Sequence, residues 1–215
     1  NSRRSEAEKL RQEERNKYTP RIRRPSVNVT LEFITPNALE SIGRYAGICY
    51  NSSLDSGSCI KRAISCKDKG HLATLRFAHA TFHVSGISRA CSHQFVRSKH
   101  LDFLQRSQRY CSEKDTSFVV PTNLKGNIDV ETLYEHSLGL YQELLKKGVK
   151  KEDARFVLPE ATTTELIVTG NFQAWIDFIK LRADTHAQWE VREVAKTINN
   201  ILSAELDNNL FHWMP

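Results

Sequence analysis

Short segments with the periodicity of β-strands alternate with longer segments of helical periodicity along most of this chain. Apolar and polar residues alternate at 27–33, and residues 163–169 are apolar and rich in β-branched side chains. Apolar residues recur every three to four positions at 129–147, which is the spacing of an amphipathic helix. Because strands and helices are interleaved, we expect an α+β fold.

Local signals predict further elements. Thr35 followed by Pro36 is typical of a helix start, with Thr35 as N-cap and Pro36 at the first helical position. Ser, Asp and Gly dominate residues 51–57, which indicates a loop. The remaining expected elements are helices at 71–78, 86–98, 172–179 and 187–202 and short strands at 80–84 and 117–120.

The basic charge of the chain is concentrated at its N-terminus. Residues 1–24 carry a net charge of +5, out of +6 for all 215 residues. We therefore expect a charged arm at 1–24 and one domain at 25–215. The arm is either a solvated extension or a contact for nucleic acid or a neighbouring subunit, and the near-neutral remainder argues against a nucleic-acid surface elsewhere.

Several classes of protein lack their usual signals. The five cysteines form no CxxC pair, which argues against a zinc site and a disulfide framework and favours a cytoplasmic, reducing setting. The chain contains no HExxH, GxSxG, GxxxxGK[ST] or GxGxxG motif. No apolar run approaches the roughly 18 residues that a membrane-spanning helix needs. We therefore expect no metal site and no membrane association.

Residues 89–110 combine cationic and amide side chains with apolar ones. The polar members are Gln94, Arg97, Lys99, Arg106, Ser107, Gln108 and Arg109, and they are interleaved with Phe95, Val96, Leu101, Phe103 and Leu104. One interpretation is an amphipathic helix with a basic outer face. The other is an element docked on the core whose polar side faces an anionic, planar ligand such as a nucleotide.

Two further segments, 154–159 and 171–192, also set an arginine among apolar residues. The guanidinium group is planar, permanently charged and forked, which suits a phosphate or the carbonyl edge of a pyrimidine. A single arginine of this kind commonly forms a structural ion pair, whereas several half-buried cations together need an anionic partner. The three segments together therefore favour a bound anion.

The spacing within these segments resembles that of the flavin-dependent thymidylate synthases. The family signature is Arg-His-Arg, seven residues, Ser, and then x-Arg-Tyr. The matching frame here is Arg97-Ser98-Lys99, residues 100–106, and Ser107-Gln108-Arg109-Tyr110. The resemblance covers roughly residues 27–205 and includes Thr35-Pro36-Asn37, Cys49-Tyr50, Gly70-His71, Phe82-His83-Val84 and residues 155–159 and 181–190.

The resemblance implies a fold, a reaction and an assembly. The fold would be a single α+β domain of short antiparallel strands with flanking helices. The reaction would transfer the methylene group of methylenetetrahydrofolate to C5 of dUMP, with NADPH-reduced FAD supplying the hydride and without a cysteine nucleophile. The assembly would be a homotetramer whose active sites are shared between subunits.

The resemblance also implies residue roles. It places dUMP against Gln94, Arg97, Gln105, Ser107, Gln108, Arg109, Arg155 and Arg182. It places FAD against His71, Ala73, Arg76, Arg97, Ser98, Lys99, Gln105, Asn171, Gln173 and Asp177. Arg182 is the expected catalytic residue, because a fixed guanidinium beside the pyrimidine stabilises charge on O2 and N3 and makes C5 more nucleophilic.

The flavin-facing positions depart from the family pattern, whereas the nucleotide-facing positions keep it. The departures are Ala73 for Ser or Thr, Arg76 for Glu, Phe77 for His, Ser98 for His, Lys99 for Arg, Gln173 for Arg and Asp177 for Asn or His. Two alternatives therefore stay open. One is a relative that modifies C5 of another pyrimidine nucleotide, for example by hydroxymethylation, and the other is a nucleotide-binding paralogue that has lost flavin chemistry.

Overall fold

The computed structural model describes residues 27–207, 210 and 211, so the arm expected at 1–24 lies outside the described residues. The described residues form two compact units. The sheet unit comprises residues 27–105, 164–207, 210 and 211, and the helical unit comprises residues 106–163. The mixture of helices with an antiparallel sheet confirms the expected α+β class.

The sheet unit is built on four strands in the order β1 (Asn28–Ile34), β2 (His79–Ser88), β4 (Thr163–Asn171) and β3 (Leu101–Gln105). The outer strands each pair antiparallel with an inner one, β1 with β2 and β3 with β4. The strands expected at 27–33, 80–84 and 163–169 are confirmed, although β2 and β4 extend beyond the expected ends.

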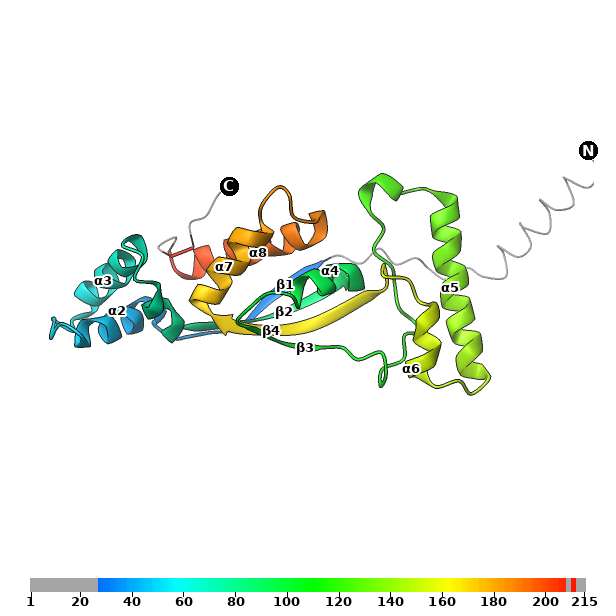
Figure 1. The fold of residues 1–215 in the computed structure, drawn as a ribbon, viewed down its shortest axis with the longest axis horizontal. Helices are drawn as coiled ribbons and strands as arrows, with labels where there is room; N and C mark the ends of the chain where they lie inside the picture. The colour runs from blue at the N-terminus through cyan, green and yellow to red at the C-terminus, as the bar shows by residue number, and fades with distance from the viewer. Residues whose placement is uncertain (1–26, 208–209, 212–215) are drawn as a thin grey trace, which may run out of the picture. The chain divides into compact units, whose positions relative to one another are not determined.

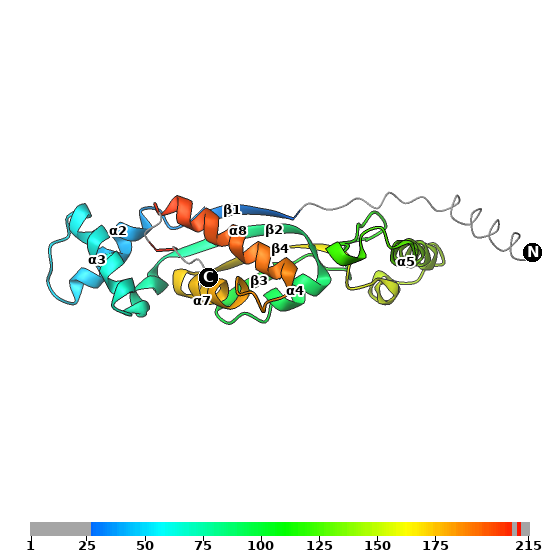
Figure 2. The same cartoon turned by 90° about the horizontal axis from the view of Figure 1, so that it is seen from above.

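Three helices cover one face of this sheet: α4 (Arg89–Phe95), α7 (Phe172–Arg182) and α8 (Trp189–Glu205) (Figures 1 and 2). Alternate side chains of the central strands, such as Phe82 and Val168, are fully buried beneath them. The helices expected from 172 and 187 are thus confirmed, with the last one starting at Trp189. Trp175 anchors α7, because its indole nitrogen donates a 3.0 Å hydrogen bond to the carbonyl oxygen of Ala80.

Two helices and a 3₁₀ turn lie beyond one end of the sheet: α2 (Ala38–Ile48), α3 (Ser56–Asp68) and η1 (Leu72–Phe77) (Figure 2). The expected helix at 71–78 is therefore the 3₁₀ turn η1. A Cβ atom at Gly43 would lie 1.7 Å from the carbonyl oxygen of Cys59, so only glycine allows α2 and α3 to approach this closely.

The expected start of α2 and the extent of the following loop are wrong. Thr35 does not cap the helix, because its hydroxyl accepts a 2.9 Å hydrogen bond from the backbone N–H of His79 in β2. The N-cap is Asn37, which adopts a left-handed φ of 49°, and the helix begins after Pro36. The loop ends at Asp55, whose carboxylate accepts a 2.9 Å hydrogen bond from Ser58 N and so starts α3 two residues early.

The helix expected at 86–98 is too long, and the strand that follows it was not expected. β2 continues through Ser88, whose hydroxyl accepts a 2.9 Å hydrogen bond from Cys91 N and caps the seven-residue α4. His100 follows in a left-handed turn with a φ of 64°. β3 comes next, and its alternating burial at Leu101 and Phe103 is the period of a strand.

The helical unit contains α5 (Ile128–Lys146), α6 (Lys151–Ala154) and the 3₁₀ turns η2 (Thr122–Leu124) and η3 (Arg155–Val157). The helix expected at 129–147 is confirmed, but its expected apolar face is partly wrong because Leu133 and Leu140 are exposed. The core of the helical unit consists of Phe118, Tyr134, Leu138, Tyr141 and Ala154. The strand expected at 117–120 is only an isolated bridge between Phe118 and Thr162. No helix among the described residues is long and apolar enough to cross a membrane.

Candidate functional site

Arg182, the last residue of α7, is fixed against α4. Its Nη2 donates a 2.9 Å hydrogen bond to the backbone oxygen of Gln94, and its Nη1 lies 3.5 Å from the side-chain oxygen of the same residue. The Nε atom of Arg182 is buried and has no hydrogen-bond partner within the described part of the chain. One edge of the guanidinium group is thus held by protein, while the buried Nε–H is not used by any described residue.

The charge around Arg182 favours an anion. Burial lowers the pKa of Arg182, and the nearby positive charge of Arg97 lowers it further. A negatively charged ligand placed beside Arg182 would stabilise its charged form against both effects. Gln105, at the end of β3, also contacts α4, because its amide nitrogen donates a 2.9 Å hydrogen bond to the hydroxyl of Ser92.

Cys91, on the buried side of α4, is not suited to nucleophilic chemistry. Its side chain is fully buried. Burial, followed by the negative charge of Glu190, raises the pKa of the Cys91 thiol far above its usual range. Because the thiolate is the nucleophilic form, this cysteine remains an inert part of the core.

The helical unit gathers four other predicted dUMP residues around Glu152. The Nε atom of Arg109 lies 3.1 Å from the Glu152 carboxylate, and the Nε atom of Arg155 donates a 3.0 Å hydrogen bond to the Glu152 backbone oxygen. Ser107 starts this segment, with its hydroxyl accepting from Arg109 N at 3.3 Å, and Gln108 is buried. One residue that the sequence did not single out thus holds both arginines.

A shallow groove borders this cluster. It is lined by Arg109, Tyr110, Leu145, Gly148, Val149, Lys150, Lys151 and Glu152. The guanidinium carbon of Arg109 lies 5.6 Å from the centre of the Tyr110 ring, and Lys151 Nζ donates a 2.7 Å hydrogen bond to the Tyr110 backbone oxygen. The cations outnumber the single carboxylate, which suits the phosphate of a nucleotide.

Replacing Glu152 by glutamine is expected to raise the affinity for dUMP about two- to fivefold at low ionic strength. The Arg109–Glu152 pair is largely exposed, so its loss costs little stability, and removing the carboxylate removes a competitor for the phosphate. Calorimetric titration with dUMP at two salt concentrations measures the effect, which salt should weaken. A drop in affinity would show that Glu152 positions Arg109 for the nucleotide instead of competing with it.

The predicted flavin residues of the sheet unit lie on η1, on α7 and in the turn after α4. His71, Ala73 and Arg76 are exposed on and beside η1, which packs against α7. Asn171 caps α7, accepting a 3.0 Å hydrogen bond from Ala174 N, and the Gln173 amide nitrogen donates to the Asp177 carboxylate at 2.8 Å.

Two polar atoms of this set have unmet hydrogen-bonding capacity. The Gln173 Oε1 and Ser98 Oγ atoms are buried and lack hydrogen-bond partners among the described residues. Buried polar atoms without partners are uncommon in folded proteins, so each indicates a missing ligand or water. Ribityl hydroxyl and ring N–H groups are donors that Gln173 Oε1 can accept from, so the residues present fit a flavin.

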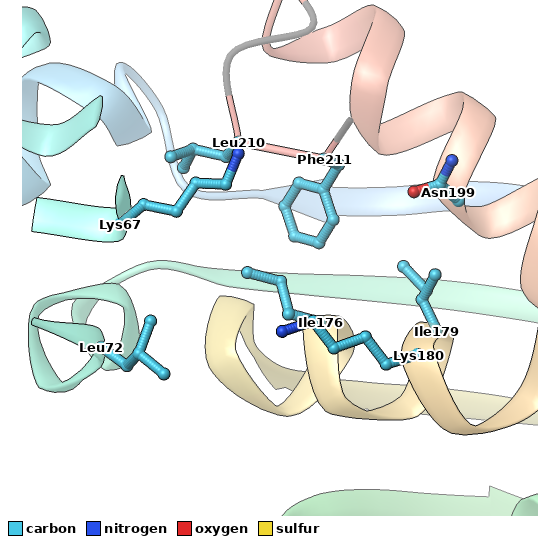
Figure 3. Close-up of a pocket in the computed structure, with 8 residues that line it drawn as sticks. All are labelled: Lys67, Leu72, Ile176, Ile179, Lys180, Asn199, Leu210 and Phe211. Atoms are coloured by element: carbon cyan, nitrogen blue, oxygen red, sulfur yellow. The ribbon is translucent and has the colours of Figure 1, made fainter. Parts of the chain in front are cut away.

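The structure also contains a cavity that the sequence did not indicate. It has a volume of about 140 Å³ and is lined by Lys67, Leu72, Ile176, Ile179, Lys180, Asn199, Leu210 and Phe211 (Figure 3). None of these residues is among the predicted site residues. Among the described residues, no group of three or more His, Cys, Asp or Glu side chains is placed to hold a metal ion.

Comparison with known proteins gives a consistent result. Residues 30–206 match the family model described as thymidylate synthase complementing protein. The chain is 38% identical over 151 residues to a flavin-dependent thymidylate synthase of Mycobacterium sp. (strain KMS), covering 60% of this chain and 59% of that protein. It is 38% identical over 153 residues to the protein of the same name from Thermococcus onnurineus (strain NA1), covering 67% of this chain and 62% of that protein. The chain thus matches about three fifths of the length of these relatives.

Proposed function

The chain belongs to the thymidylate synthase complementing protein family, and from this premise we propose that it is a flavin-dependent thymidylate synthase. It would methylate dUMP at C5 to give dTMP, with methylenetetrahydrofolate as the carbon donor, FAD as the cofactor and NADPH as the reductant. The observation that carries the proposal is the Arg182 guanidinium, which is fixed by Gln94, lies near Arg97 and has a buried Nε–H without a hydrogen-bond partner among the described residues.

In this proposal Arg182 polarises the pyrimidine. Its unpartnered N–H donates to the O2 and N3 edge of the ring, where negative charge grows as C5 becomes nucleophilic. A donor that is already fixed in place stabilises that charge without reorganisation. The hydrogen bonds to Gln94 provide this fixation. Arg97 adds positive charge, which favours an anionic nucleotide at the same place.

The remaining predicted nucleotide residues bind and orient dUMP. Arg109 and Arg155 would form charge-assisted hydrogen bonds to the phosphate, helped by Ser107 and Gln108. The family resemblance assigns Gln94, Arg97 and Gln105 to the sugar and ring of dUMP. Since the Nε–H of Arg109 is bound to Glu152 in this structure, the carboxylate and the phosphate compete for the same guanidinium group.

FAD would be held by the predicted residues on η1, the turn after α4 and α7, namely His71, Ala73, Arg76, Arg97, Ser98, Lys99, Gln105, Asn171, Gln173 and Asp177. When bound and reduced by NADPH, it supplies the hydride. The buried Ser98 Oγ and Gln173 Oε1 atoms, which have no hydrogen-bond partner within the part of the chain that the structure describes, support this placement. We further propose a homotetramer that works in the cytoplasm, and the five free cysteines are compatible with a reducing compartment.

Release of tritium from C5-labelled dUMP, in the presence of FAD, NADPH and methylenetetrahydrofolate, tests this function. The expected result is release that requires all three additions and yields dTMP. Preferential release from UMP or dCMP would instead identify a relative that acts on another pyrimidine nucleotide. A colourless protein that takes up no FAD yet binds dUMP would reject the synthase and identify a nucleotide-binding paralogue.

A further inference from the structure

Two aromatic side chains lie next to each other on the surface of the sheet unit. Phe77, at the end of η1, is 61% exposed, and Tyr45 of α2 is 43% exposed. Their ring centres are 5.6 Å apart, with the ring planes tilted by 56°. We call this pair the aromatic ledge. Adjacent exposed rings offer an apolar surface on which a planar ligand can stack.

The aromatic ledge borders residues that belong to the proposed flavin site. The same short element, η1, also carries Ala73 and the exposed cation Arg76, the residue directly before Phe77. η1 packs against both α2 and α7, and α7 contributes Gln173 and Asp177. The aromatic ledge and the exposed cation Arg76 therefore lie on elements that pack together, and η1 also packs against the helix that carries Gln173 and Asp177.

This combination fits one half of FAD better than the other. The isoalloxazine ring has to remain accessible to NADPH and to the pyrimidine during the reaction, so sealing one of its faces on a protein ring would hinder turnover. The adenine ring takes no part in the chemistry, and a pyrophosphate group follows it closely. Aromatic side chains stack on adenine, and an arginine pairs with the phosphate.

Resting on the proposed function, we infer that the aromatic ledge stacks the adenine ring of FAD and that Arg76 binds its pyrophosphate. At these two positions the chain has an aromatic ring and a cation, where the family resemblance sets an imidazole and a carboxylate. The two departures act together, because they add stacking surface and positive charge at one place. In this chain the flavin site therefore gains contacts to the adenosine half of FAD.

The test compares the FAD affinity of the apoprotein with that of two variants, Phe77→Ala and the double variant Tyr45→Ala/Phe77→Ala. Flavin absorbance and fluorescence measure the binding. Loss of stacking is expected to weaken FAD about five- to fiftyfold and to leave dUMP affinity unchanged. Phe77→Trp should retain affinity, and ADP should compete for FAD with the wild-type protein but poorly with Phe77→Ala. Phe156→Ala is the matched control, because this phenylalanine is 82% exposed in the helical unit.

Each other outcome overturns the inference in a recognisable way. Unchanged FAD affinity in Phe77→Ala, with FAD-dependent tritium release intact, rejects the aromatic ledge and leaves the proposed function standing. An equal loss of FMN affinity shows that the rings hold the flavin half. A change in sedimentation without a change in FAD binding shows that a second copy of the chain covers the rings. Failure of the wild-type protein to bind FAD rejects both proposals.

Discussion

Replacing Arg182 by alanine is expected to lower kcat for dUMP methylation by about 10²- to 10³-fold, which is the usual effect of removing one fixed donor from a site of developing charge. The loss should fall on kcat more than on KM, because the other cations still bind the phosphate. Tritium release at saturating dUMP measures this effect. Arg182→Lys should recover only part of the rate. A lysine keeps the charge but loses the planar guanidinium group, which can bond to Gln94 and to the pyrimidine at the same time.

Arg192→Ala is the matched control for Arg182. Arg192 also donates one hydrogen bond to a backbone carbonyl, that of Thr185 at 2.7 Å, but it lies outside the proposed site. Both variants lose an arginine–backbone bond, so both should show similar, modest shifts in unfolding midpoint. If the two variants lost turnover to the same extent, Arg182 would have a structural role and its assignment as the catalytic residue would be wrong.

The sequence predicted those elements of the fold in which the apolar residues of the sequence pattern are also the buried residues of the structure. The apolar, β-branched segment at 163–169 became β4, with every second side chain buried, and the helical spacing at 129–147 became α5. α3 was not predicted, because only Cys59 and Ala63 of its thirteen residues are buried and neither gives a strong apolar signal. The helix start at Pro36 failed because a tertiary hydrogen bond to β2 occupies the hydroxyl of Thr35.

The candidate site divides in the same way. The family motif predicted Gln94 and Arg97 as site residues. Gln94 lies in the last turn of α4 and Arg97 lies two residues after the end of that helix. Glu152 carries no sequence signal, because its contact with Arg109 joins residues 43 positions apart and depends on where α6 begins. Likewise, no pattern indicates that Arg182 is held by the backbone oxygen of Gln94, 88 positions away. Partners that are set by tertiary packing are visible only in the fold.

Glu190 gives the second large expected effect, this time on stability. Its side chain is only 1% exposed, and its two carboxylate oxygens accept hydrogen bonds from the backbone N–H and the hydroxyl of Ser88, at 2.7 and 2.5 Å. Ser88 ends β2 and caps α4, the helix that carries Gln94. One carboxylate at the start of α8 therefore fixes the junction between the sheet and the helix that holds Arg182.

Glu190→Ala is expected to destabilise the protein by about 3 kcal/mol, because it leaves a buried N–H and hydroxyl without their charged partner. For a protein of this size that corresponds to a fall of about 10 °C in the unfolding midpoint, measured by calorimetry or circular dichroism. Glu190→Gln should lose less, since its amide still offers an acceptor to Ser88 N. Glu193→Ala, at an exposed position of the same helix, is the control and should unfold like the wild type. A normal midpoint for Glu190→Ala would mean that water replaces the carboxylate and that the junction between β2 and α4 is held by packing alone.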